Sequence, residues 1–210
     1  MNNSSGYNVL WVLIAAVLLV SSIQLMKKDA ELQNDKADNK QKHDETVVSP
    51  EQAGTGNTIS SDDGIFKVTL PQGFAGATSN NMQYDSEVGK VETTQFSSQN
   101  GSSICLVNIS KYPEEAFKNN SPKQLLDYSN SSLVSNMGGR ITDKRDFYMS
   151  GCQARTTYFE VLDDGTMAYS RIDIVLSDPF FYQVLYVTDK KPELQSQDIL
   201  AYLNSITINK

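Results

Sequence analysis

Side chains that commonly carry out catalysis or bind metals are scarce in this sequence. Its 210 residues include a single histidine, His43, and two cysteines, Cys105 and Cys152. His43 falls in a polar N-terminal segment, which excludes a Ser–His–Asp triad or a histidine metal cluster from the rest of the chain. The cysteines lack the C-x-x-C spacing of zinc and thioredoxin-like sites. We therefore predict no catalytic residue, no metal site and no cofactor, and we expect that the protein is not an enzyme.

Two further absences narrow the choice of function. The sequence has no P-loop, G-x-G-x-x-G or G-x-S-x-G string, which are the usual signatures of nucleotide sites and nucleophile elbows. Positive charge is in deficit, with 18 Lys and Arg against 25 Asp and Glu and a net charge of −7. Nucleic-acid-binding proteins present a basic face, so we exclude nucleic acid as a partner.

The two cysteines leave three interpretations open. Each lies in a segment with strand character, where a small buried thiol is common. In an exported protein, a Cys105–Cys152 disulfide would contribute about 4 kcal/mol in the chain-entropy model. A reactive pair is the third interpretation.

Adjacent acidic residues occur at Asp62-Asp63, Glu114-Glu115 and Asp163-Asp164. A carboxylate-based hydrolase would need two carboxyl groups across a cleft. Neighbouring acids in turns more often simply form the turn, so a hydrolase is the least favoured function. The aromatic stretch Phe180–Tyr182 with Tyr186 could form an interaction surface, but strand alternation places half of it in the core.

An apolar segment near the N-terminus is long enough to cross a membrane. The 20 residues from Tyr7 to Met26 carry no charge, and a helix of this length spans about 30 Å, the thickness of a bilayer's hydrocarbon core. We predict a retained transmembrane anchor over residues 1–26. Its expected lipid-contacting residues are Val9, Leu10, Trp11, Val12, Leu13, Ile14, Val17, Leu18, Leu19 and Val20.

A cleaved signal peptide is the alternative, since Val20-Ser21-Ser22 offers small residues for cleavage. Signal peptides usually begin with a basic region, which this segment lacks, and their apolar part is shorter.

Residues 27–62 are polar and charged, so we expect a flexible linker that holds the domain on the order of 30 Å from the bilayer. Lys27, Lys28, Lys36, Lys40 and Lys42 follow the apolar segment, and the positive-inside rule would then place the domain in the cytoplasm.

Residues 63–210 are predicted to form one α+β domain with helices packed on an antiparallel sheet. Period-two alternation predicts strands at 65–70 and 103–110, and residues 77–90 hold at most one short strand around 82–84. Ser121-Pro122 with Gln124 predicts a helix that ends at Gly138-Gly139. Short connections predict an antiparallel meander of strands at 140–150, 152–162, 167–176 and 180–188. A helix at 194–204 and an extended segment at 206–208 complete the domain.

Several strings in this domain resemble bacterial envelope proteins of the DcrB type, within the PsbP-like superfamily. They are DGIFKVTLP at 63–71, SICLVNISKYP before the long helix, MSGCQARTTYFEV, TMAYSRIDIVLSDPFFYQVLYVT, and ILAYLNSITI near the C-terminus. The resemblance covers about residues 60–208 and implies an antiparallel sheet flanked by helices. It also implies a non-enzymatic accessory or binding protein with no shared catalytic residues. A lipoprotein of this type needs a cysteine after its signal, and the first cysteine here is Cys105. A protein span would do the same anchoring work, which favours the retained anchor.

We therefore expect a single-pass membrane protein whose C-terminal domain is an extracytoplasmic binding or accessory module of the cell envelope. Its expected partners are the lipid bilayer and an envelope protein. The lysines after the apolar segment favour a cytoplasmic domain, but we prefer an exported one because long domains translocate largely regardless of charge. The alternative is the same domain facing the cytoplasm as a membrane-tethered interaction module.

Overall fold

The structure is a computed structural model that describes residues 52–53, 57–74, 76–86, 89–163 and 165–209. The predicted anchor, including Val9–Val20, and the linker up to residue 51 lie outside the described residues, as does His43. Within the described part, no helix is both long and apolar enough to cross a bilayer.

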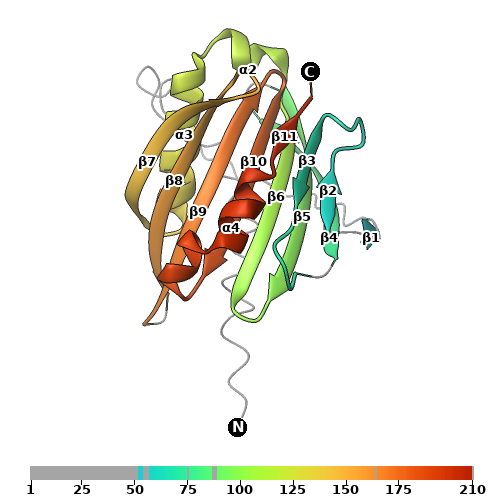
Figure 1. The fold of residues 1–210 in the computed structure, drawn as a ribbon. Helices are drawn as coiled ribbons and strands as arrows, with labels where there is room; N and C mark the ends of the chain where they lie inside the picture. Colours follow the sequence, from blue (N-terminus) through green and yellow to red (C-terminus); the bar gives the residue numbers. More distant parts are fainter. Residues whose placement is uncertain (1–51, 54–56, 75, 87–88, 164, 210) are drawn as a thin grey trace.

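One large antiparallel sheet organises the described residues (Figure 1). In spatial order its strands are β1 (Gln52–Ala53), β4 (Ala77–Ser86), β5 (Gly89–Asn100), β6 (Ser103–Lys111), β10 (Phe180–Thr188), β9 (Thr166–Ser177), β8 (Cys152–Asp163) and β7 (Arg140–Met149). All neighbouring pairs are antiparallel. The predicted α+β class and the antiparallel meander are therefore confirmed.

Both faces of this sheet are covered, which produces three layers. On one face lie the small sheet β11 (Thr207–Ile208), β3 (Phe66–Thr69) and β2 (Thr58–Ser60), the 3-10 helix η2 (Lys191–Gln195) and the helix α4 (Gln197–Asn204). On the other face lie the helices α2 (Glu114–Lys118) and α3 (Pro122–Asn136). Figure 1 shows α4 in front of the sheet and α3 behind it. We call these two sides the α4 face and the α3 face.

The two covers explain why the central strands are apolar on both sides. In β6, all residues from Ser103 to Ser110 are buried, as expected for a strand packed on both faces. The aromatic stretch in β10 divides between the two cores: Phe181 contacts Tyr112 on the α3 face, and Tyr182 stacks on Phe66 on the α4 face with ring centroids 4.9 Å apart. Alternation predicts that half of this aromatic stretch lies in the core, and the structure buries more of it, because both faces of β10 are covered: Phe181, Tyr182 and Tyr186 are all buried.

Helix α3 begins with the capping box that the sequence indicates. The Ser121 side chain accepts a hydrogen bond from the Gln124 backbone N–H, and the Gln124 side chain accepts one from the Ser121 N–H. Leu125, Leu126, Leu133 and Val134 are buried against the sheet. After the helix, Gly138 takes a φ of 63°, a left-handed conformation that glycine adopts without a steric cost.

An ion-paired arginine fixes α3 to the sheet. Arg155 of β8 has 2% of its side chain exposed and contacts two carboxylates. Its Nη1 donates to Asp127 Oδ1 of α3 at 2.7 Å, and its Nη2 donates to Asp146 Oδ2 of β7 at 3.1 Å. The Arg155 guanidinium thus connects α3 to β7 and β8, the two outermost strands at this edge of the sheet.

The structure corrects three expectations about the elements. Residues 77–90 do not hold one short strand, because β4 and β5 form a long hairpin whose buried polar residues are satisfied by partners: Gln95 donates to Asn108 at 3.0 Å. The folded part begins before residue 63, since β2 pairs with β3 and buries Ile59. The expected helix at 194–204 is divided into η2 and α4 by Ser196, whose extended backbone and side chain cap α4.

Candidate ligand-binding cleft

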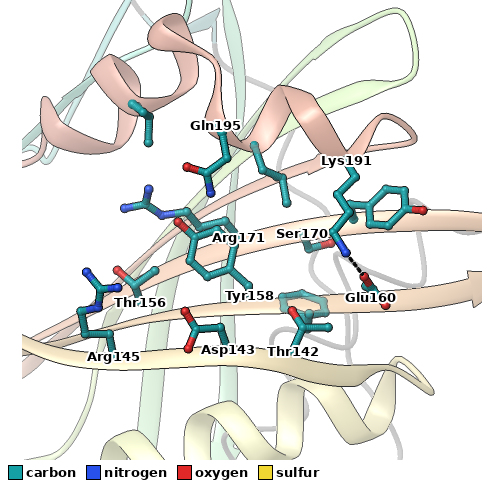
Figure 2. A pocket seen from close by; sticks show the side chains of 14 residues that line it. Thr142, Asp143, Arg145, Thr156, Tyr158, Glu160, Ser170, Arg171, Lys191 and Gln195 are labelled. Atoms are coloured by element: carbon teal, nitrogen blue, oxygen red, sulfur yellow. Dashed lines mark hydrogen bonds and ion pairs between the residues drawn. The ribbon is translucent and has the colours of Figure 1, made fainter.

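A cleft of about 510 Å³ lies on the α4 face, between the outer strands β7, β8 and β9 and the segment formed by η2 and α4 (Figure 2). Most of its lining residues are polar or charged, and they include three cations; two tyrosines also line it. The lining residues are Thr142, Asp143, Arg145, Thr156, Tyr158, Phe159, Glu160, Tyr169, Ser170, Arg171, Lys191, Leu194, Gln195 and Leu200.

Strand register brings these side chains together. Arg145 lies opposite Thr156, which in turn lies opposite Asp173. Two residues farther along each strand, and on the same face, Asp143 lies opposite Tyr158, which lies opposite Arg171. Directly opposed side chains in an antiparallel pair have Cβ atoms about 5 Å apart, so residues far apart in sequence form one continuous wall.

One end of the cleft contains Arg145 and Arg171. Arg171 donates through Nε and Nη2 to the buried carboxylate of Asp173, at 3.2 and 2.9 Å. Its guanidinium carbon also lies 5.5 Å from the ring centroid of Tyr158. These contacts fix the side chain and leave Nη1 without a described partner. Arg145 is exposed and makes no ion pair with a described residue, and in Figure 2 it points toward the same end as Thr156 and Arg171.

The other end contains an ion-paired group. Lys191 of η2 donates to Glu160 of β8 at 2.8 Å, and Arg140 donates to the other oxygen of this carboxylate at 3.1 Å. The Lys191 nitrogen lies 5.5 Å from the ring centroid of Tyr169. Hydrogen bonds from Lys191 and Arg140 lower the pKa of Glu160 below its ordinary value of 4.5. Glu160 is therefore ionised at neutral pH and is poorly suited to act as a general acid, which requires a raised pKa.

A second carboxylate holds η2 in place beside the cleft. Glu193 Oε2 accepts hydrogen bonds from Thr188 at 2.8 Å, Tyr186 at 3.0 Å and Ser103 at 3.1 Å. Burial of Glu193 opposes its ionisation, but these donors outweigh burial and lower its pKa. Because η2 carries Lys191 and Gln195, this contact sets the position of one wall of the cleft.

The residues that the sequence singled out lie elsewhere. Cys105 and Cys152 are both free and buried, 1% and 4% exposed. They lie on β6 and β8, with β10 and β9 between them, so about three strand spacings near 4.8 Å separate them, beyond the Cα separation of a disulfide. Burial raises the pKa of the Cys105 thiol, which disfavours the reactive thiolate.

The acidic pairs contribute to local structure. Asp63 accepts hydrogen bonds from the Ser61 hydroxyl and the Ile65 N–H within a turn, and Glu114 pairs with the exposed Lys118 one helical turn away. Asp164 lies outside the described residues. Among the described residues, no group of three His, Cys, Asp or Glu side chains is arranged to hold a metal ion.

Sequence reasoning missed the cleft because its residues come from separate elements. The available signal was the alternation in Tyr169-Ser170-Arg171-Ile172-Asp173, where charged residues recur on one face of a strand that is apolar on the other. Such alternation indicates a polar face, but it does not show that η2 and α4 cover that face.

Comparison with known proteins gives the fold. No protein-family model matches the chain, and no curated protein matches its sequence. The solution structure of cyanobacterial PsbP (CyanoP) from Synechocystis sp. PCC 6803 is similar, with a TM-score of 0.50 and 13% sequence identity over 77% of this chain and 98% of that one. LpqN of Mycobacterium tuberculosis, which is involved in cell envelope biogenesis, has a TM-score of 0.43 and 12% identity over 80% and 94%. The likeness to CyanoP, together with the antiparallel sheet covered on both faces, shows that the chain has a PsbP-like fold.

Proposed function

We propose that this protein is a non-enzymatic binding or accessory protein of the cell envelope, and that its PsbP-like domain receives a small polar ligand in the cleft. In this proposal the apolar segment Val9–Val20 holds the domain at the membrane, outside the cytoplasm. The observation that chiefly supports a binding role is the cleft itself. Its volume of about 510 Å³ lies within the usual range for small-molecule sites, and its Arg145 side chain has no ion-pair partner among the described residues.

The chemistry of the cleft favours binding over catalysis. Its two lining carboxylates are Asp143 and Glu160, and the ion-paired Glu160 has a lowered pKa. A glycosidase-type hydrolase needs one carboxyl group with a raised pKa to protonate the leaving group. The fixed guanidinium of Arg171 and the free one of Arg145 are instead typical of recognition sites.

The extracytoplasmic position rests on the resemblance of residues 60–208 to DcrB-type envelope proteins. The alternative, a cytoplasm-facing module, is favoured by the five lysines that follow the apolar segment and by the two free thiols. The two positions predict different labelling by a membrane-impermeant maleimide. Because both native cysteines are buried, a new one is needed at an exposed residue, and Lys111 at the end of β6 is suitable.

In intact cells, Lys111→Cys should react with the maleimide and the unmodified protein should not. Labelling of Lys111→Cys only after lysis would place the domain in the cytoplasm. The same cells test the anchor: the protein should stay in the membrane fraction at high salt, whereas a soluble protein beginning near Ile23 would contradict it.

The binding role is tested with the full chain in detergent micelles, carrying ¹³C-labelled tyrosine. A library of small polar compounds should contain members that shift the NMR signals of Tyr158 and Tyr169, which line the cleft. Tyr148 is 71% exposed and does not line the cleft, so its signal is the control for nonspecific surface contact. If no compound shifts the two cleft tyrosines, the cleft is not a ligand site.

A further inference from the structure

We infer that the ligand of the cleft is an acidic sugar, that is, a hydroxylated ring bearing a carboxylate or phosphate group; this inference rests on the proposed binding function. It depends on three properties of the lining: its many polar residues, a cationic end where Arg145 makes no ion pair with a described residue, and a carboxylate beside that end, Asp143, that also makes none.

The types of residue that line the cleft favour a hydrophilic ligand. Of the 14 lining residues, nine are polar or charged, two are tyrosines, and three are apolar, namely Phe159, Leu194 and Leu200. Most small-molecule pockets are lined mainly by apolar and aromatic side chains, and an acyl chain in this cleft would desolvate charged and hydroxyl groups without replacing their hydrogen bonds. A lipid tail is therefore a poor fit, and a ligand with many hydrogen-bonding groups is a good one.

The cationic end selects for an anion. Arg171 uses Nε and Nη2 on Asp173, so Nη1 remains for a ligand, and the Arg145 guanidinium has all its donors free of described partners. Thr156 lies between Arg145 and Asp173 in the strand register and adds a hydroxyl. Guanidinium groups match the oxygen geometry of carboxylate and phosphate. In a chain of net charge −7, the Arg145 guanidinium is a local positive charge that attracts an anion.

The neighbouring carboxylate favours a ligand that also donates hydrogen bonds. Asp143 lines the cleft two residues before Arg145, on the same face of β7, and makes no ion pair with a described residue. A simple anion next to Arg145 would be repelled by this carboxylate. A hydroxyl group, in contrast, donates to it, and the Gln195 amide and Thr142 hydroxyl offer further positions for hydroxyls. Tyr158, whose ring has the Arg171 guanidinium over one side, adds an amphipathic side chain against which a sugar ring can pack.

The test is calorimetric titration of the full chain in micelles with glucuronate, glucose 6-phosphate, glucose and inorganic phosphate. At least one acidic sugar should bind at least tenfold more tightly than both glucose and inorganic phosphate, and its affinity should fall as salt is added. A glucuronate disaccharide compared with the monosaccharide distinguishes a polymer from a free metabolite, because a polymer site should bind the disaccharide more tightly.

Two variants and one control examine the roles of the side chains. Arg145→Gln should weaken acidic-sugar binding at least tenfold, whereas Lys144→Gln, which removes the same charge from the opposite face of β7, should change it less than twofold. Asp143→Ala should weaken acidic-sugar binding and strengthen inorganic-phosphate binding, since it removes both a hydroxyl acceptor and a repulsive charge. All three residues are exposed, so the variants should fold.

Three results would overturn the inference: equal binding of glucose and the acidic sugars, an unchanged affinity in Arg145→Gln, or no binding of any acidic sugar. If uncharged compounds from the tyrosine NMR library shift Tyr158 and Tyr169 while acidic sugars do not, the acidic-sugar inference is wrong and the binding function stands. If nothing shifts these tyrosines, both are wrong.

Discussion

The buried Arg155 gives a sharp prediction, because removing its partners should cost more stability than removing the arginine itself. In the double variant Asp127→Asn/Asp146→Asn, the guanidinium remains at a site where 2% of its side chain is exposed, but both compensating charges are lost. In Arg155→Met, an apolar chain of similar length fills the same space. The two carboxylates then remain, with 37% and 53% of their side chains exposed to solvent.

The magnitudes follow from desolvation. Removing one partner of a fully buried ion pair costs about 3–5 kcal/mol, because an uncompensated charge stays buried. Here water can reach the site past the half-exposed acids, so we expect about 2–3 kcal/mol for the double variant. Replacing a buried charge with a well-packed apolar chain is close to neutral, and mutual repulsion of the two solvated acids adds little, so Arg155→Met should cost about 1 kcal/mol or less.

Urea unfolding followed by far-UV circular dichroism measures both costs. Circular dichroism is preferred because the single tryptophan, Trp11, lies outside the described domain. Glu114→Gln is the control, since it removes an acid from the exposed Glu114–Lys118 pair and should change the free energy of unfolding by less than about 0.5 kcal/mol. The reasoning is refuted if Arg155→Met is the more destabilised of the two variants.

The same contacts predict a loss of stability in acid. The hydrogen bond from Arg155 lowers the pKa of Asp146; for Asp127, burial raises the pKa, but hydrogen bonds from Arg155 and Lys123 outweigh it. Both folded pKa values thus lie below the ordinary value of 3.8. Their stabilisation is complete well above 3.8 and is lost as the pH falls through the folded values. The unmodified protein should lose stability below about pH 4 more steeply than the double variant.

Three further predictions concern single contacts. Glu193→Ala leaves the hydroxyl of the buried Tyr186 without its acceptor, so the free energy of unfolding should fall by about 2 kcal/mol, and an unchanged urea midpoint would contradict the role assigned to Glu193. Ser121→Ala removes the cap of α3 and should cost about 1 kcal/mol by thermal unfolding, whereas Ser121→Asp should keep most of the stability. Cys105 and Cys152 should resist an aromatic disulfide reagent in the native protein and react in step with unfolding in urea; rapid native reaction would show that the buried thiols are accessible.

Local signals in the sequence were sufficient for the elements whose boundaries depend on neighbouring residues. Ser121, Pro122 and Gln124 determined where α3 begins, since a capping box involves only the first turn of a helix. Short connections determined the antiparallel meander from β7 to β10, because a parallel crossover needs a longer chain. Alternation likewise indicated β3 and β6, and the apolar residues on both faces of β6 are typical of the central strand that it forms.

The β4–β5 hairpin could not be predicted from these signals, since its residues are mostly polar. Their burial is explained only by pairing: Gln95 bonds to Asn108, which bonds to Gln183. Arg155 is a similar case, because an arginine in a strand is usually exposed, and its burial depends on carboxylates from α3 and β7.

The sequence by itself determined α3, β3, β6 and the meander from β7 to β10, because propensity, caps and alternation act over a few residues. Only the tertiary structure decided that Arg145, Tyr158 and Arg171 from three strands meet Lys191 of η2 around one cleft. The physical reason is that alternation specifies the face on which a side chain lies, while its neighbours depend on strand register and on which segment covers that face.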